Sequence, residues 1–157
     1  MVQESTTLSI RAAGQADARA LALLRTRSLI EMGLLDEDIR TAQSFIDEAS
    51  LRIEALFARE RLAASLLLDG PRPAGCACVV FWNRLPYPDG FAHAEIAGVY
   101  VAPEYRRRGY ATTLTRAAIE TARARSVRKI VLYPTAEART LYERLGFTAA
   151  DQLQLRC

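Results

Sequence analysis

Residues 94–111 carry the most chemical information in this chain, because an apolar stretch leads into a basic turn and then into a helical pattern. The turn holds three arginines and a glycine, Arg106-Arg107-Arg108-Gly109. Backbone N–H groups in a tight turn, backed by a helix N-terminus, form a concave site of partial positive charge. Glycine lets the backbone approach a ligand closely, since it has no Cβ. This order predicts a phosphate or pyrophosphate site; the alternative is a basic surface turn.

Two common nucleotide loops are excluded, because the chain has neither Gly-x-x-x-x-Gly-Lys-Ser/Thr nor Gly-x-Gly-x-x-Gly after a strand. The spacing from Arg106 to Ala111 is Arg-x-x-Gly-x-Ala, which resembles the pyrophosphate loop of the GNAT superfamily of N-acetyltransferases. The preceding Val99-Tyr100-Val101-x-Pro-Glu-Tyr is similar to that family's central strand and its exit. Further along, Leu141-Tyr142-Glu143-Arg144-Leu145-Gly146-Phe147 is similar to its Leu-Tyr-Glu-x-Leu-Gly-Phe signature. The likeness covers roughly residues 94–149, and residues 1–93 fit only by their pattern.

The resemblance implies that acetyl-CoA is the co-substrate and inserts between the central strand and the next parallel strand. Its amides would pair with the backbone at Val99 and Val101, and Gly98 suits a bulge that opens this gap, with close packing as the alternative. Many members carry Asn where this chain has Thr135, which can cap a helix but cannot reproduce an amide contact. The implied cofactor-binding residues are Val99, Tyr100, Val101, Arg106, Arg107, Arg108, Gly109, Tyr110, Ala111, Thr112, Thr135 and Arg139.

Two residues are candidates for catalysis. Tyr142 matches the family's tyrosine that faces the cofactor sulfur, and a phenol suits a thiolate as general acid because their pKa values differ by only about two units. Glu95 lies where some members carry a glutamate that acts as base, directly or through water. Desolvation on an apolar strand would raise its pKa, which suits a base. The alternatives are a packing role for Tyr142 and a salt-bridged or substrate-binding role for Glu95.

The elements that must position these residues follow from hydrophobic periodicity and turn signals. Leu21, Leu24 and Ser28 form one stripe of the first helix, and Asp36 or Asp38 caps the second. The strand over 128–133 is apolar enough to be buried on both faces, and Thr135 would cap the next helix. The crossover from 94 to 133 implies a parallel pair. We expect strands at 8–12, 61–68, 74–82, 94–101, 128–133 and 152–156, helices at 15–31, 36–59, 110–125 and 136–145, and a loop at 83–91.

Length and composition fit one soluble enzyme domain over residues 1–157. Half of the residues are hydrophobic, a quarter are charged, and the net charge is +3. This positive charge is explained either by a solvated surface or by attraction of a polyanionic cofactor. Nucleic acid is the least favoured partner. No export signal or membrane-spanning run is apparent, so we expect a cytoplasmic protein without a membrane partner. We interpret the three cysteines, Cys76, Cys78 and Cys157, as reduced thiols. The chain has a single histidine, His93, which argues against a metal site.

The sequence therefore predicts an α/β fold of GNAT type: a mixed, mostly antiparallel sheet with a splayed central parallel pair and helices on both faces. The expected function is acetyl-CoA-dependent transfer of an acetyl group to a primary amine of a small molecule or protein, with a small-molecule or peptide amine as the acceptor. A non-catalytic acyl-CoA-binding module or sensor on the same fold is the alternative, and a basic nucleic-acid binder is a weaker one. Dimers are common in the family, so a homodimer also stays open.

Overall fold

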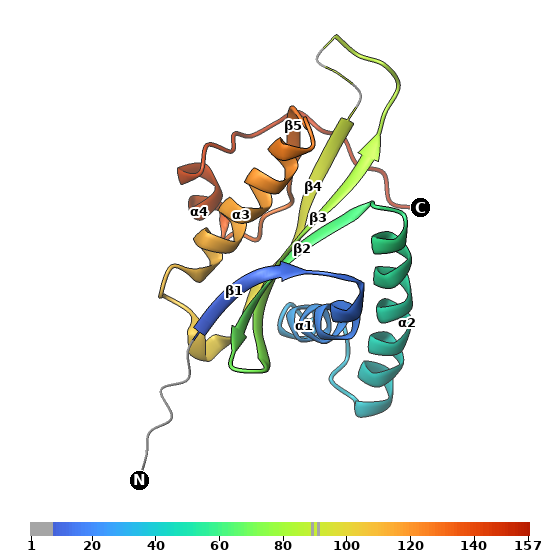
Figure 1. Cartoon of the computed structure of the whole chain (residues 1–157), viewed down its shortest axis with the longest axis vertical. Helices are drawn as coiled ribbons and strands as arrows, with labels where there is room; N and C mark the ends of the chain where they lie inside the picture. The colour runs from blue at the N-terminus through green and yellow to red at the C-terminus, as the bar shows by residue number, and fades with distance from the viewer. Residues whose placement is uncertain (1–7, 89, 91) are drawn as a thin grey trace.

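Five strands form one sheet in the order β1-β2-β3-β4-β5 (Figure 1). The structure is a computed structural model that describes residues 8–88, 90 and 92–157; Asp89 and Phe91 of the expected loop, and residues 1–7, lie outside it. The first four strands pair antiparallel, whereas β5 runs parallel to β4. The strands are β1 (Leu8–Ala13), β2 (Leu62–Asp69), β3 (Arg72–Asn83), β4 (Ala92–Val101) and β5 (Lys129–Val131).

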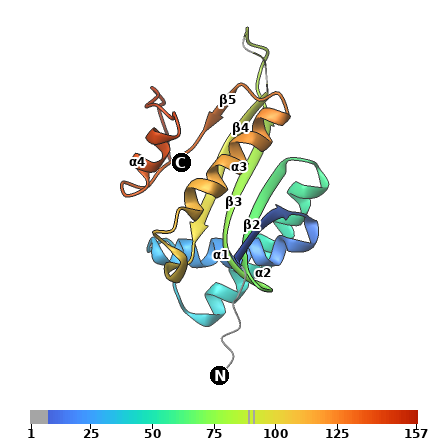
Figure 2. The ribbon, with the colours of Figure 1, turned by 60° about the vertical axis from the view of Figure 1, so that its left-hand side comes forward.

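Helices lie on both sides of this sheet, as Figure 1 shows: α1 (Ala18–Glu31) and α2 (Ile39–Ala58) on one side, and α3 (Tyr110–Ala124) on the other. The short α4 (Arg139–Arg144) lies near the β5 edge (Figure 2). Two 3-10 turns, η1 (Gln15–Asp17) and η2 (Pro103–Tyr105), lead toward α1 and α3. Asp38 caps α2, because its carboxylate accepts from the amides of Arg40 and Thr41 at 3.1 Å each.

The core is contributed by both helical layers and by the sheet between them. The most deeply buried large side chains are at most 1% exposed and include Leu21 and Leu24 of α1, Leu66 and Leu67 of β2, and Leu114 of α3. The predicted stripe of α1 is therefore confirmed at Leu21 and Leu24, while Ser28 is half-buried. Burying these side chains supplies the main stabilisation of the sheet–helix layers, at about 1.5–3 kcal/mol for each.

Three sequence predictions near the C-terminus are wrong. β5 is only three residues long, with Lys129 exposed and Ile130 and Val131 half-buried, because it is an edge strand and not a strand covered on both faces. Ala138, not Thr135, precedes α4, and no side chain caps that helix. Residues 152–156 form no strand, and Leu153 and Leu155 are fully or almost fully exposed there. Alternation of apolar and polar residues permits a strand, but a strand also needs a partner edge.

Candidate active site

The parallel strands β4 and β5 separate soon after they begin. Their pairing runs only from His93 opposite Lys129 to Glu95 opposite Val131. β4 then continues to Val101 with β3 on one side, and no described strand pairs with its other edge. The backbone groups on this outer edge, including those of Val99, are therefore not paired with a described strand, and only the Val101 carbonyl is known to accept a hydrogen bond, from the Arg106 side chain.

A bulge in β4 sets which side chains face α1. Tyr100 lies opposite Cys76, while Ala97 lies opposite Cys78, so β4 has one residue more than β3 in this interval. Gly98 has a φ of +63°, a conformation that glycine adopts without steric cost. The extra residue puts Glu95 and Tyr100 on the same face, although they are an odd number of positions apart. The predicted bulge at Gly98 is thus confirmed.

The basic turn leads directly into α3 and leaves its first amides open. Arg107 and Gly109 both have positive φ, +63° and +82°, so the turn curves around its own amide groups. The first helical hydrogen bond runs from Thr113 N to Gly109 O at 3.1 Å, and Gly109 provides no side-chain cap. The N–H groups of Tyr110, Ala111 and Thr112 therefore point out of the helix end. A Cβ added at Gly109 would meet no atom within 4 Å, so the space in front of this turn is open.

Arg106 differs from its neighbours, because its side chain is held by the protein. Its guanidinium donates to Glu31 Oε2 at 2.5 Å and to Val101 O at 2.8 Å, and its amide donates to Pro103 O at 3.2 Å. Tyr100 donates to the other Glu31 oxygen at 2.6 Å. Burial opposes ionisation of Glu31, but these hydrogen bonds outweigh it and lower its pKa, while burial and Glu31 raise the pKa of Tyr100 to about 12. We therefore expect phosphate contacts mainly from residues 107–112.

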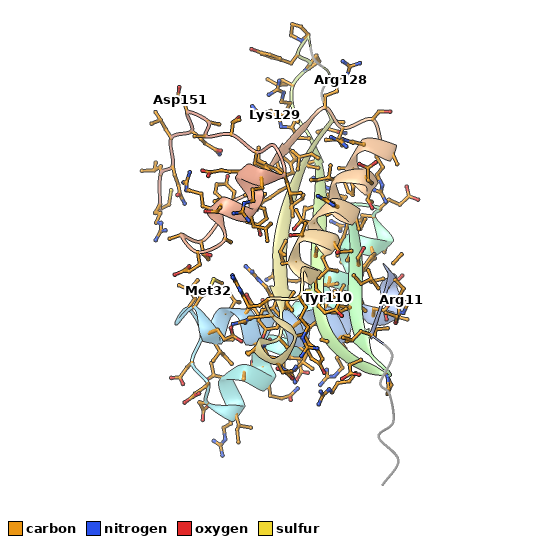
Figure 3. The ribbon with its side chains drawn as sticks, turned by 90° about the vertical axis from the view of Figure 1, so that its left-hand side faces the viewer. Arg11, Met32, Tyr110, Arg128, Lys129 and Asp151 are labelled. Atoms are coloured by element: carbon orange, nitrogen blue, oxygen red, sulfur yellow. The ribbon has the colours of Figure 1, made fainter. Side chains whose placement is uncertain are left out.

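This contact joins the end of α1 to the start of α3. Figure 3 shows Met32, just after α1, and Tyr110, the first residue of α3, at a similar height, with Lys129 of β5 well above them. β4 and β5 part soon after Lys129. The outer edge of β4 and the open turn thus form one continuous path along the molecule.

Tyr142 lies on the inward face of α4. It is 9% exposed, its ring makes an edge contact with Phe147 at 6.0 Å, and burial raises its pKa. No hydrogen-bond partner for its hydroxyl is found in the part of the chain that the structure describes. Thr135 and Arg139 are exposed nearby in sequence: the Thr135 carbonyl accepts from the Ala138 and Arg139 amides, and Arg139 lies 3.7 Å from Glu143.

Glu95 is the last residue of β4 that pairs with β5, and it is half-buried. Burial raises its pKa, and the positive charge of Arg25 partly opposes that rise. Arg25 belongs to α1, so Glu95 faces the side of the sheet that α1 covers. A carboxylate with a raised pKa beside the open edge of β4 fits a general base better than a purely structural ion pair.

The two neighbouring cysteines lie on that same side of the sheet. A hydrogen bond with Cys78 and burial raise the pKa of Cys76, and a hydrogen bond from Cys76 lowers the pKa of Cys78. The charge of Arg25 acts on both thiols as well. Both are free thiols, as is the exposed Cys157, in agreement with the sequence.

A model of the acetyltransferase (GNAT) family matches residues 32–147, which is more than half of the chain. The chain belongs to the GNAT family of acetyltransferases. No curated protein is similar enough to count as a match. The predicted family and fold are thereby confirmed, while the roles of the individual site residues stay predictions.

Solved structures with the same fold include acetyltransferases that are named for different acetyl acceptors. A predicted acetyltransferase from Clostridium acetobutylicum with acetyl-CoA has a TM-score of 0.84 at 23% identity, over 96% of each chain. Glucosamine-6-phosphate N-acetyltransferase from Arabidopsis thaliana has a TM-score of 0.73 at 14% identity, over 96% of this chain and 98% of that one. An aminoglycoside N-acetyltransferase in complex with CoA has a TM-score of 0.72 at 16% identity, over 100% and 98%. At such identities the likeness shows the GNAT fold and leaves the acceptor open.

Two residues of the site were not predicted from the sequence. Arg25 follows Leu21 by one helical turn, so its place on the predicted inward stripe was a usable signal. Glu31 gave no such signal, because its partners Tyr100 and Arg106 lie 69 and 75 positions away.

Neither a membrane span nor a metal cluster is present among the described residues. None of the described helices combines the length and apolar character needed to cross a bilayer. The same residues contain no group of three or more His, Cys, Asp or Glu side chains arranged to hold a metal ion.

Proposed function

We propose that this GNAT acetyltransferase is an acetyl-CoA-dependent N-acetyltransferase that acts on a primary amine. One observation carries the proposal: the free outer edge of β4 leads through η2 into the open amides at the start of α3. This path suits a ligand with an extended, amide-containing arm and a pyrophosphate. Relatives in fold solved with acetyl-CoA and with CoA support the same choice of cofactor.

The residues fit the cofactor in two ways. Val99 and Val101 lie on an edge that no described strand pairs with, and their backbone groups are proposed to bind the amides of the cofactor, although the Val101 carbonyl already accepts from Arg106. The turn at 107–112 offers backbone amides, a helix N-terminus and an open space in front of Gly109. Arg107 and Arg108 add exposed positive charge at this end. Thr135 and Arg139 follow the C-terminal end of β5, where both are exposed, and we propose that they contact the cofactor from there.

Acetyl-CoA supplies an activated acyl group when it is bound. Transfer forms one N–C bond and breaks one C–S bond, and it needs a base for the amine proton and an acid for the leaving sulfur. We assign the base to Glu95, directly or through water, because its raised pKa brings its basicity closer to neutral pH. We assign the acid to Tyr142, whose raised pKa keeps the phenol protonated until its proton is needed.

Replacing Gly109 with valine tests where the pyrophosphate binds. The new side chain would project into the open space before α3, so CoA binding measured by calorimetry should be lost. Gly70→Val is the matched control, because Gly70 also has a positive φ, +57°, and no atom within 4 Å of an added Cβ. Both variants place valine at a positive φ, but only Gly109→Val should lose CoA. Unchanged CoA affinity in Gly109→Val would refute the placement.

A thiol-release screen tests the activity itself. Wild-type protein with acetyl-CoA should release free CoA in the presence of at least one class of primary amine. If CoA binds tightly and no amine class is acetylated, the chain is an acyl-CoA-binding module and the proposed enzymatic function fails.

A further inference from the structure

Arg25 is an arginine on a helix stripe that otherwise faces the sheet. It follows Leu21 by one helical turn and Leu24 by one residue, and these leucines are 1% and 0% exposed. Residues four apart lie on one side of a helix, so Arg25 also turns toward the sheet. It is nevertheless exposed, which means that solvent reaches this part of the α1–sheet interface.

The charge of Arg25 falls on the half of the sheet that carries Glu95. Its field acts on Glu95 of β4 and on Cys76 and Cys78 of β3. In the sheet register, Glu95 lies opposite Val80 and Cys78 opposite Ala97, so these positions form one small area of the same face. α1 packs against β3 and β4, so the charge of Arg25 acts close to the region where β4 leaves β5.

Among the described residues, Arg25 has no ion-pair or hydrogen-bond partner that explains this placement. No described carboxylate lies within ion-pair distance of its guanidinium, and no hydrogen bond from it is found in the described chain. By contrast, Arg19 on the same helix pairs with Asp47 at 3.0 Å, and Arg106 pairs with Glu31. An inward-turned cation without a partner contributes little to folding, whereas a leucine there would extend the apolar stripe.

From this arrangement we infer that Arg25 binds an anionic group of the acceptor, so that the substrates are primary amines that also carry a carboxylate or a phosphate. The inference rests on the proposed function, because it takes the amine to lie at Glu95. A guanidinium forms paired, charge-assisted hydrogen bonds with either oxyanion. Holding the anion at Arg25 would direct the amine of the same molecule toward the carboxylate of Glu95 on the facing strand.

Matched amines that differ only in the anionic group test the inference. The probes are γ-aminobutyrate against butylamine, and aminoethyl phosphate against ethanolamine, each with acetyl-CoA at constant ionic strength. We expect kcat/KM to favour the anionic member of one pair by about ten- to hundredfold. The pair that shows the preference separates carboxylate from phosphate recognition, and a series of glycine, β-alanine and γ-aminobutyrate gives the preferred spacing.

The decisive variant is Arg25→Gln, in which this ratio should fall to near one, while Arg25→Lys should keep part of it. The ratio isolates recognition, because a change in the basicity of Glu95 affects both members of a pair alike. Arg27→Gln is the matched control: Arg27 is also exposed on α1, is turned roughly opposite to Arg25, and lines a recess of about 200 Å³ with Tyr100 and Pro103. This control should retain the preference.

Three outcomes would overturn the inference: no preference in the wild type, a preference that survives Arg25→Gln, or an equal loss in Arg27→Gln. If no amine is acetylated although CoA binds, the proposed function fails. Whether Arg25 binds an anion is then tested separately, by calorimetry on the CoA-loaded protein. Binding of γ-aminobutyrate or aminoethyl phosphate that weakens in Arg25→Gln supports the anion site. Absence of binding by both probes rejects it.

Discussion

The hydroxyl of Tyr142 is the group on which the proposed acid step depends. Because the ring is buried and its pKa is raised, Tyr142→Phe removes a proton donor and leaves the packing with Phe147 in place. We expect CoA affinity to be retained and kcat to fall by roughly a hundred- to ten-thousandfold. Tyr133→Phe is the control, since Tyr133 is 64% exposed. Wild-type kcat in Tyr142→Phe would leave this residue with a packing role only.

The second prediction about a single residue concerns the carboxylate of Glu95. Its raised pKa means that the ionised, basic form appears only as pH rises through that value, so the rate should climb along an acidic limb. Glu95→Gln should lower the rate and remove this limb, with partial recovery at high pH where more amine is neutral. The measurement is a pH–rate profile of kcat/KM, with Glu120→Gln on the exposed face of α3 as control. A profile identical to wild type would eliminate Glu95 as the base.

At the scale of elements, the corner between β1 and α1 depends on one ion pair. Asp17 accepts from both terminal nitrogens of Arg11 at 2.9 and 2.8 Å and from the Gly14 amide at 2.9 Å. The hydrogen bonds from Arg11 are the main cause that lowers the pKa of Asp17 to about 2, although burial opposes them. The folded state thus favours the ionised carboxylate, and this stabilisation is present above the unfolded pKa and lost as pH falls toward 2.

Asp17→Asn should therefore reduce the free energy of unfolding by about 1 kcal/mol at pH 7, and the difference from wild type should shrink as pH falls from about 4 toward 2. Urea unfolding at several pH values measures this. Asp47→Asn is the control, because the Arg19–Asp47 pair is exposed on both sides and should contribute little. A difference that stays constant with pH would show that the ion pair is not the cause.

For the whole molecule, the cofactor path joins elements that are far apart in the chain. Glu31 at the end of α1 holds Arg106 before α3, and the open edge of β4 lies between the two ends of the sheet. A ligand bound along this path stabilises only the folded state. CoA at a hundred times its Kd should add about 2.7 kcal/mol to the free energy of unfolding, which raises Tm by about 5–11 °C. Calorimetric melting should show this shift in the wild type and in Gly70→Val, and an equal shift in Gly109→Val would contradict the proposed path.

Features whose interactions lie within a few residues could be predicted from the sequence. The cap of α2, expected at Asp36 or Asp38 and found at Asp38, the glycine at the head of α3 and the bulge at Gly98 each depend on local chemistry. The two GNAT signatures are local in the same sense, which is why the family and the fold could be predicted before any packing was known.

Interactions between distant residues emerge only when the chain is folded. Arg106 belongs to a phosphate-binding motif, yet its guanidinium turns to Glu31, which lies 75 positions away. β5 is short and half-exposed because no described strand covers its outer edge, and residues 152–156 alternate like a strand without pairing as one. The charge of Arg25 acts on Glu95 only because α1 packs against β3 and β4. Pairing across such separations depends on which surfaces pack together, and periodicity within a single segment does not contain that information.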